Sequence, residues 1–195
     1  DLFFSIPISA ISGQTSIAGN FGGIRNKGFE LSLNYDLIKS ADPTGLKVNI
    51  WGNGAINDNT ITELDLPPGQ TQQNLGNTVR RIGGPVGEYF VFDYAGINPS
   101  TGNHMFYTAD GNLTETPDPA NDRRATGKSN LPVYQGGFGF NADYKGFFLN
   151  TLFSYQYDVW RIDNQLSWAY NPDFIGDDNV SADLLNAWTP TNQTA

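Results

Sequence analysis

Residues 21–64 read FGGIRNKGFELSLNYDLIKSADPTGLKVNIWGNGAINDNTITEL, two long alternating stretches joined by a short turn at 42–45. In the first stretch, odd positions 29–37 are apolar and even positions 30–36 are polar. In the second, positions 46, 48, 50 and 56 are apolar, whereas 47, 49, 53 and 57 are polar. A period of two indicates strands with one face toward an apolar medium and one toward water. Each stretch is long enough for the roughly 9 to 11 residues that cross a bilayer as a tilted strand.

Composition narrows the class of protein. Only 38% of the 195 residues are hydrophobic, yet 13% are aromatic and 22 are glycine, which favours sheet and turn over helix. No stretch approaches the roughly 18 apolar residues of a membrane-spanning helix, so a membrane location requires a closed barrel of strands. The net charge of −9 argues against a nucleic-acid partner. Because cysteine is absent, disulfides and thiolate metal sites are excluded.

A second pair of alternating stretches is predicted at 133–144 and 147–160, joined by Tyr144, Lys145 and Gly146. Residues 65–130 are rich in Pro, Asn, Gln, Thr and Gly and predict a long loop that contains a small hairpin. Residues 161–195 predict another loop, with a short helix at about 181–187. Short turns thus alternate with long polar loops, as periplasmic turns alternate with extracellular loops in bacterial outer-membrane barrels.

We therefore expect an all-β chain, an antiparallel transmembrane β-barrel, of which residues 1–195 form one partial domain with about five strands. Residues 2–9 would supply the fifth strand, and residues 8–23 a connecting loop. A soluble β-sandwich can show the same alternation. Long loops confined to one end favour the barrel.

The run RNKGFELSLNY at 25–35 is the first of several short motifs that occur in order along the chain. It resembles the RNKG-[VF]-E-L-x-L-x-Y segment of the SusC/RagA family of TonB-dependent outer-membrane transporters. Further similar motifs follow in family order: GGPVGEYF at 83–90, YAGINPSTG at 94–102, PVYQGGF at 132–138 and YKGF at 144–147. The similarity covers nearly the whole chain.

The resemblance implies a large barrel of about 22 strands with an N-terminal plug. Such transporters import oligosaccharides or peptides across the bacterial outer membrane, with a SusD-like surface lipoprotein as lid and energy relayed by TonB. The plug and the TonB-contacting segment are not among these 195 residues, so we expect a fragment of a longer chain. The sequence leaves open whether the transporter pairs with a second copy. Two alternatives remain: a secreted β-rich glycan-binding module or adhesin, and a structural or secretion-accessory barrel.

Candidate site residues follow from these patterns. Loop aromatics could stack on sugar rings or pack on peptide side chains: Tyr89, Phe90, Tyr94, Trp160 and Trp168. Polar strand residues are predicted to face the lumen: Asn49, Asn53, Asn150 and Gln156. Apolar strand residues are predicted to face lipid: Leu31, Leu33, Val48, Ile50, Leu149 and Phe153.

We expect no catalytic residue, metal or cofactor. His104 is the only histidine, so neither a histidine-based triad nor a multi-histidine metal site can be built within this chain. The acidic residues Asp173, Asp177 and Asp178 lack the spacing of a calcium-binding loop. Their simplest interpretation is a solvated helix start.

Overall fold

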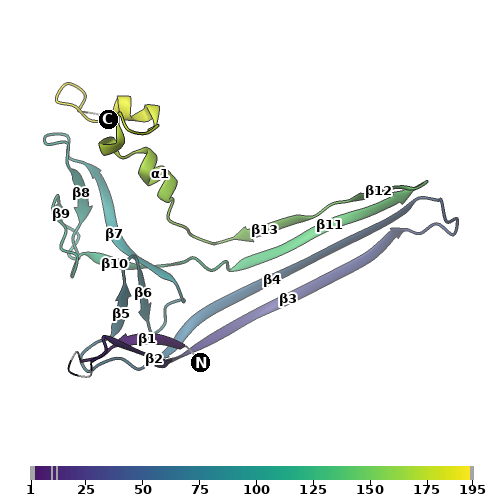
Figure 1. The fold of residues 1–195 in the computed structure, drawn as a ribbon, viewed down its shortest axis with the longest axis horizontal. Helices are drawn as coiled ribbons and strands as arrows, with labels where there is room; N and C mark the ends of the chain where they lie inside the picture. The colour runs from purple at the N-terminus through teal and green to yellow at the C-terminus, as the bar shows by residue number, and fades with distance from the viewer. Residues whose placement is uncertain (1–2, 10, 12, 194–195) are drawn as a thin grey trace. The chain divides into compact units, whose positions relative to one another are not determined.

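The computed structural model describes residues 3–9, 11 and 13–193 (Figure 1). It divides into two compact units, which we describe separately. The first comprises Asp1–Leu75, Val79–Glu88 and Gly127–Trp160; the second comprises Gly76–Thr78, Tyr89–Thr126 and Arg161–Ala195. No helix among the described residues is long and apolar enough to span a membrane.

The first unit is built on a five-stranded antiparallel sheet that contains both strand pairs predicted from the alternation. The prediction that residues 2–9 supply its fifth strand was wrong, because residues 3–7 pair with residues 16–20 in a separate two-stranded sheet. The strands of the five-stranded sheet are β3 (Gly22–Ile38), β4 (Lys47–Leu64), β11 (Tyr134–Tyr144), β12 (Phe147–Asn150) and β13 (Phe153–Tyr157). β4 lies between β3 and β11, while β12 and β13 follow one another along the other edge of β11 (Figure 1). β3 and β4 pair over nearly their whole length, with irregularities at each end.

The sequence predicts one strand over 147–160, whereas the structure interrupts it at Thr151. The Thr151 amide donates to the Phe140 carbonyl at 2.9 Å. The Phe140 amide, however, donates to the Thr151 side-chain hydroxyl at 2.9 Å. A side-chain oxygen thus takes the place of the backbone acceptor, which breaks the ladder locally. The register is unchanged on either side, where Asn141 pairs with Asn150 and Phe138 with Phe153.

Both short turns of this sheet lie at one end (Figure 1). In the β3–β4 turn, Asp42 accepts hydrogen bonds from the Thr44 amide and hydroxyl, both at 2.9 Å. The Thr44 amide is the main cause of the lowered pKa of the Asp42 carboxyl. In the β11–β12 turn, Lys145 and Gly146 have φ of +50° and +84°, as a two-residue hairpin of type I′ requires. The Lys145 amide donates to the Thr44 carbonyl at 3.0 Å and joins the two turns.

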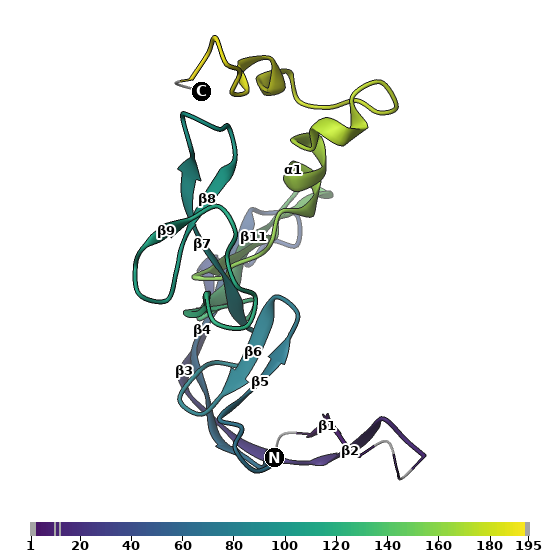
Figure 2. The same cartoon turned by 90° about the vertical axis from the view of Figure 1, so that its left-hand side faces the viewer.

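The N-terminal region forms a hairpin of β1 (Phe3–Pro7) and β2 (Ser16–Asn20) (Figure 2). The prediction of a connecting loop over 8–23 was therefore wrong for β2. Its small and polar residues carry a weak strand signal, and the strand forms because β1 provides a partner, with Ile6 paired to Ile17.

Residues 65–130 are more ordered than the predicted loop with one hairpin. β5 (Gln72–Leu75) and β6 (Thr78–Arg81) are neighbours. β7 (Glu88–Ile97) pairs with β8 (His104–Tyr107), which pairs with β9 (Leu113–Thr114) (Figure 2). β10 (Arg123–Ser129) pairs with β7. Besides the predicted hairpin, which is β7 and β8, this segment contains four further strands: β5, β6, β9 and β10.

The described C-terminal residues contain α1 (Asn164–Ala169) and two 3-10 helices, η2 (Pro172–Phe174) and η3 (Ala182–Asn186). The short helix expected at 181–187 is η3, so it is a 3-10 helix and not an α-helix. The Ser181 hydroxyl caps it by accepting from the Asp183 amide at 3.2 Å. Helix α1 was not predicted, although Asp163 caps it in the same way, accepting from the Leu166 amide at 2.8 Å.

Little hydrophobic surface is buried. Among the described residues, only Ile61, Val79 and Phe90 are buried hydrophobic residues. Most large apolar side chains of the five-stranded sheet are exposed instead, with Ile61 at the end of β4 as the buried exception. The sheet therefore has no apolar core of its own within the described residues.

Candidate functional site

The five-stranded sheet has an apolar face, which the strand register defines. Residues paired across neighbouring strands point to the same side of a sheet. Leu33 pairs with Gly52, Gly52 with Phe138, and Phe138 with Phe153. The same alternation places all six residues predicted to face lipid on this side: Leu31, Leu33, Val48, Ile50, Leu149 and Phe153. That this face contacts lipid stays a prediction.

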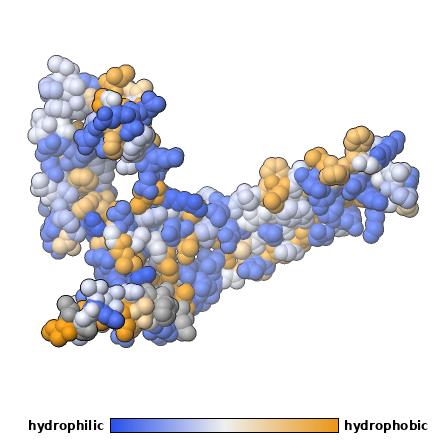
Figure 3. Space-filling view, in the orientation of Figure 1, coloured by the Kyte–Doolittle hydropathy of each residue, from blue (hydrophilic) through white to orange (hydrophobic). Residues whose placement is uncertain are grey.

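The apolar face is open to the surroundings. The exposed fractions are 49% for Leu31, 64% for Leu33 and 52% for Phe153. Figure 3 shows hydrophobic residues gathered along the sheet over β12 and β13. The rings of Phe138 and Phe153 stack at 5.2 Å between centroids. This pair packs across the strands without withdrawing from the surface.

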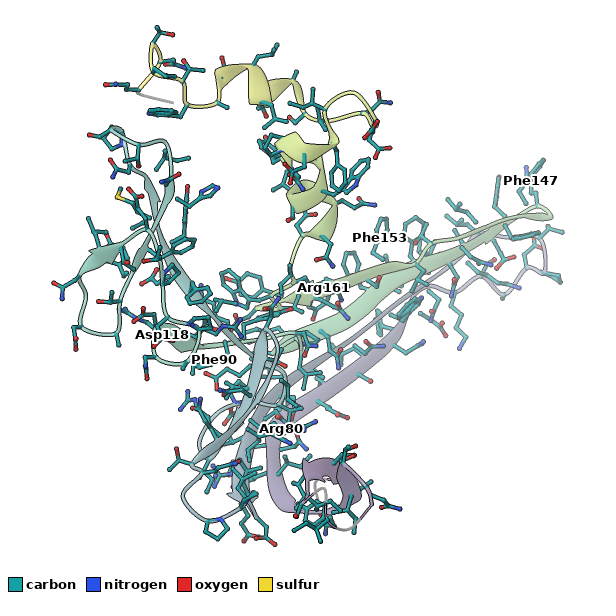
Figure 4. All side chains as sticks on the ribbon, turned by 60° about the vertical axis from the view of Figure 1, so that its left-hand side comes forward. Arg80, Phe90, Asp118, Phe147, Phe153 and Arg161 are labelled. Carbon is teal, nitrogen blue, oxygen red and sulfur yellow. The ribbon has the colours of Figure 1, made fainter. Side chains whose placement is uncertain are left out.

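The apolar stretch on β3 is long enough to cover most of the height of a membrane-spanning apolar band. From Phe29 to Leu37, β3 advances eight residues, about 27 Å along the strand and roughly 20 Å along a barrel axis at about 40° tilt. The apolar band of outer-membrane barrels is about 25 Å tall. Aromatic rings lie at both ends: Tyr134 and Tyr157, 5.7 Å apart, at one, and Tyr144 and Phe147 at the other. Figure 4 shows Phe147 at the tip of the sheet and Phe153 farther along it.

The polar face carries amide and hydroxyl side chains. The Asn49 side-chain amide donates to Asn34 and to Asp36, each at 2.9 Å, across β3 and β4. The register places all four residues predicted to face the lumen on this side: Asn49, Asn53, Asn150 and Gln156. Polar residues line a hollow of about 650 Å³ here, among them Glu30, Ser32, Asn53, Gln135 and Gln156. Their facing toward a lumen remains untested.

Trp51 was missed by the sequence reasoning. The register pairs it with Asn34 on one side and Gly139 on the other, so it lies on the polar face. A Cβ atom on Gly139 would lie 2.9 Å from the indole ring, and one on Gly137 would lie 3.8 Å from it. The indole therefore lies across two glycines. The odd position of Trp51, shared with Asn49 and Asn53, is the signal that could have placed it.

Three of the predicted loop aromatics lie on β7 and differ in how far their rings are exposed. Tyr94 is 52% exposed, and its ring lies 5.6 Å from the His104 ring and 5.7 Å from Phe106. Its hydroxyl is 3.3 Å from His104 Nδ1. Phe90 is only 5% exposed (Figure 4), so it presents no ring face to a ligand. The prediction that Phe90 contacts substrate is therefore replaced by a role in packing. Tyr89, the third of these aromatics, is half-buried.

The two predicted tryptophans belong to different units. Trp160 belongs to the first unit, where it is 43% exposed and the Lys128 ammonium lies 3.5 Å from its ring centroid. Its indole nitrogen donates to Asp158 at 3.1 Å. Trp168 belongs to the second unit, is 42% exposed and packs 5.6 Å from Phe174. The predicted aromatics are therefore divided between the two units.

The GGPVGEYF segment anchors the loop to β4. The Gly84 carbonyl accepts from the Ile61 amide and the Gly83 amide donates to the Ile61 carbonyl, both at 2.9 Å. Glu88 is fully buried and accepts from Arg81 Nε and Nη2 at 2.8 Å and from the Gly127 amide at 2.7 Å. These bonds to Glu88 raise the pKa of Arg81. A Cβ on Gly84 would lie 2.3 Å from the Glu88 carboxylate, so any larger residue there would displace this buried, hydrogen-bonded group.

The YAGINPSTG segment forms the tip of the β7–β8 hairpin. The Glu115 carboxylate accepts from Thr101 at 2.7 Å and from the Asn103 amide group at 2.8 Å, and these bonds, with one from Asn98, lower its pKa. Trp188 donates from its indole nitrogen to the Pro99 carbonyl at 2.9 Å. Its ring covers Gly102, where an added Cβ would lie 2.3 Å from it. The C-terminal segment is thus docked on the hairpin.

The described residues contain no group of three or more His, Cys, Asp or Glu side chains placed to hold a metal ion. Asp173 lies in η2, where its amide donates to Asn171. The amides of Asp177 and Asp178 donate to the Phe174 carbonyl. Asp177 and Asp178 therefore lie in a turn after η2, whereas the start of the next helix, η3, is capped by Ser181 and not by these acids.

Comparison with known proteins adds sequence relatives. No family model matches the chain. It is 28% identical over 218 residues to TonB-dependent receptor P3 of Formosa agariphila, covering 98% of this chain and 20% of the relative. It is 26% identical over 209 residues to TonB-dependent receptor P39 of the same organism, covering 83% of this chain and 20% of the relative. The chain spans about one fifth of these relatives' length.

Solved structures that are similar to this chain come from the same kind of protein as its sequence relatives. The RagAB peptide transporter matches the whole chain with a TM-score of 0.80 and 29% identity. The RagAB peptide importer in its 'closed-closed' state matches with a TM-score of 0.80 and 30% identity. In both cases the chain covers 22% of the solved chain. With these likenesses and its ordered sequence motifs, the chain belongs to the TonB-dependent receptors of the SusC/RagA type.

Proposed function

We propose that this chain forms part of the wall and the outer loops of a TonB-dependent importer in the bacterial outer membrane. The observation that carries the proposal is the two-faced sheet. Its apolar face is exposed over most of the height of a bilayer's apolar band and bounded by aromatic rings, while its other face carries amides and carboxylates. A lipid-facing outside and a water-facing inside require this arrangement.

The loops give the proposed wall its direction. The turns at 42–45 and 145–146 are short, whereas the segments at the opposite strand ends, 65–130 and 161–195, are long. Outer-membrane barrels keep short turns in the periplasm and long loops outside. We therefore assign residues 1–195 to one partial barrel domain, with 65–130 and 161–195 as extracellular loops.

In this arrangement the polar face lines the barrel lumen. Asn49, Asn53, Asn150 and Gln156 present neutral donors and acceptors to it, and Trp51 adds an aromatic face. Neutral amides suit oligosaccharides or peptides, which both offer donors and acceptors without requiring opposite charge. Among the exposed loop aromatics, Tyr94, Trp160 and Trp168 are the proposed substrate contacts, with the half-buried Tyr89 at the margin.

The importer function extends to parts of the receptor outside this chain. Transport would be energised by TonB, with a SusD-like surface lipoprotein as the lid, and no reaction would be catalysed. The names of the similar proteins, TonB-dependent receptors and a peptide transporter, support import over adhesion or a purely structural barrel. A secreted adhesin would also need to bury the apolar face that this sheet exposes.

Uptake by cells tests the proposal. A strain that lacks the full-length receptor is grown on oligosaccharide or peptide mixtures as the sole carbon source, with and without the receptor restored. We expect growth on at least one mixture to require both the receptor and TonB, and the receptor to fractionate with the outer membrane. Recovery of the receptor in the culture medium, or growth that never depends on it, would contradict the proposal.

A further inference from the structure

Two basic residues continue the apolar face beyond its outer end. Arg25 and Lys27 lie on β3 at the odd positions that also carry Phe29 and Leu31, so they share a face with them. Both are exposed, and neither forms an ion pair with any acid among the described residues. Lys27 is paired in register with Asp58, which is also exposed. One acid therefore faces two cations, which leaves a net positive charge.

The depth of these cations matches a lipid headgroup. Lys27 lies two residues beyond Phe29, about 7 Å along the strand and roughly 5 Å farther along the barrel axis. Tyr134 and Tyr157 share this face and are in register with Phe29, and aromatic rings mark the membrane interface in such barrels. Arg25 and Lys27 thus lie just outside the hydrocarbon region, at the strand ends that carry the long loops.

A groove lies in the apolar face on the far side of Phe29 from these cations and begins at Leu31. It has a volume of about 660 Å³ and is lined mainly by Leu31, Leu33, Ile50, Phe138 and Tyr155. Gly52 and Gly54 are paired with Leu33 and Leu31, so the floor has no side chains at these points. The Tyr155 hydroxyl lies 2.9 Å from the position of a Cβ on Gly54 and closes one side. Glycine on β4 therefore creates a channel along the strands.

We propose that Arg25, Lys27 and this groove bind a phosphorylated glycolipid of the outer leaflet. Its phosphate would contact the two basic side chains, and one acyl chain would lie in the groove. Charge complementarity selects an anionic headgroup, and the apolar groove below it selects a lipid over free phosphate. The inference rests on the proposed function, because it requires the apolar face to contact lipid.

Lipid retention by the purified full-length receptor tests the site. Lipopolysaccharide is titrated onto wild type, onto an Arg25→Gln/Lys27→Gln variant, and onto a Lys39→Gln/Lys145→Gln variant that removes the same charge at the turn end. Binding is followed by native mass spectrometry. We expect roughly 30-fold weaker binding for the first variant, because each basic residue contributes about fivefold at an anionic lipid surface. The second variant should bind as wild type does.

Two further arms identify what is recognised. Dephosphorylated lipopolysaccharide should bind wild type as weakly as intact lipid binds the Arg25/Lys27 variant, and inorganic pyrophosphate should compete poorly. Gly52→Leu, which fills the groove without changing charge, should also weaken binding. Equal binding by wild type and both double variants would overturn the site, and full competition by pyrophosphate would replace the lipid by a free anion.

A label on the apolar face separates this inference from the proposed function. A fluorophore on Leu31→Cys in the reconstituted receptor should be quenched by bromine-labelled lipid. Quenching together with unchanged lipid binding in the Arg25/Lys27 variant would overturn the glycolipid site alone. Absence of quenching would overturn both the site and the proposed wall.

Discussion

Leu33 occupies the middle of the apolar face, and Leu33→Arg should destabilise the receptor folded in a bilayer by about 2–4 kcal/mol. The residue lies four positions from both Phe29 and Leu37, the ends of the apolar stretch on β3, which places it near the bilayer midplane. It is 64% exposed and faces Gly52, so the substitution causes no clash. The cost would come from placing a guanidinium in hydrocarbon.

Two matched variants isolate that cost. Asn34→Arg places the same side chain at nearly the same depth on the polar face, where it should cost much less. Phe29→Arg lies on the apolar face near the interface, where the penalty for a basic residue falls to about 0–1 kcal/mol, in addition to the lost ring. The assay measures how much full-length receptor folds into lipid vesicles at increasing urea concentration. The folded fraction is read from its heat-sensitive shift in migration on gels.

The ranking of these variants decides the outcome. Leu33→Arg should have the lowest folding midpoint, and its difference from Asn34→Arg should exceed 1 kcal/mol. Equal losses for Leu33→Arg and Asn34→Arg would refute the assigned facing of β3. A larger loss for Asn34→Arg would indicate that the polar face is the one in contact with lipid.

Three further outcomes follow from the loops and the sheet. Glu88→Ala should lower the free energy of unfolding by about 2–3 kcal/mol, because it leaves Arg81 and the Gly127 amide without their acceptor. It should also speed proteolysis of residues 76–126, whereas Asp110→Asn, a change in an exposed loop, should have neither effect. Gly139→Ala should reduce the folded fraction, since its Cβ would lie 2.1 Å from a backbone carbonyl oxygen, whereas Gly52→Ala meets nothing closer than 3.6 Å and should be tolerated. Because the pKa of Glu115 is lowered in the folded chain, its contribution to hairpin stability is present at neutral pH and is lost as pH falls below about 4. Hydrogen exchange of the hairpin tip, residues 98–103, should therefore accelerate in acid for wild type and depend less on pH in Glu115→Gln. Unchanged proteolysis in Glu88→Ala, equal folding of the two glycine variants, or the same acid response in Glu115→Gln would contradict the respective contact.

The alternating strands were predictable because their signal is local. From Phe29 to Leu37, the odd or even position of a residue decides which face of the strand its side chain occupies. The turn residues Asp42 and Gly45 show where the chain reverses. Strand positions agreed with the structure to within a few residues on β3, β4 and β11. The faces of the predicted lumen and lipid residues separate for the same reason.

The remaining features depend on partners far away in the sequence. Trp51 lies across Gly139 on another strand, and Glu88 meets Gly127 in a different segment. Trp188 docks on Gly102 through a contact that no local pattern encodes. The short strands β5 and β10 are polar, so they form because neighbouring strands supply hydrogen bonds and not because of propensity. Phe90 was mistaken for an exposed ring because parity alone cannot tell a protein interior from open solvent.

The most direct measurement of the central claim is a nitroxide scan of residues 28–37 in the full-length receptor reconstituted into lipid bilayers. Collision with oxygen, which concentrates in hydrocarbon, and with a water-soluble nickel chelate is measured at each position. The two-faced wall predicts high oxygen accessibility at 29, 31, 33, 35 and 37, with a maximum near Leu33, and low values at the even positions. Equal oxygen accessibility at odd and even positions, or a maximum at the even ones, would contradict it.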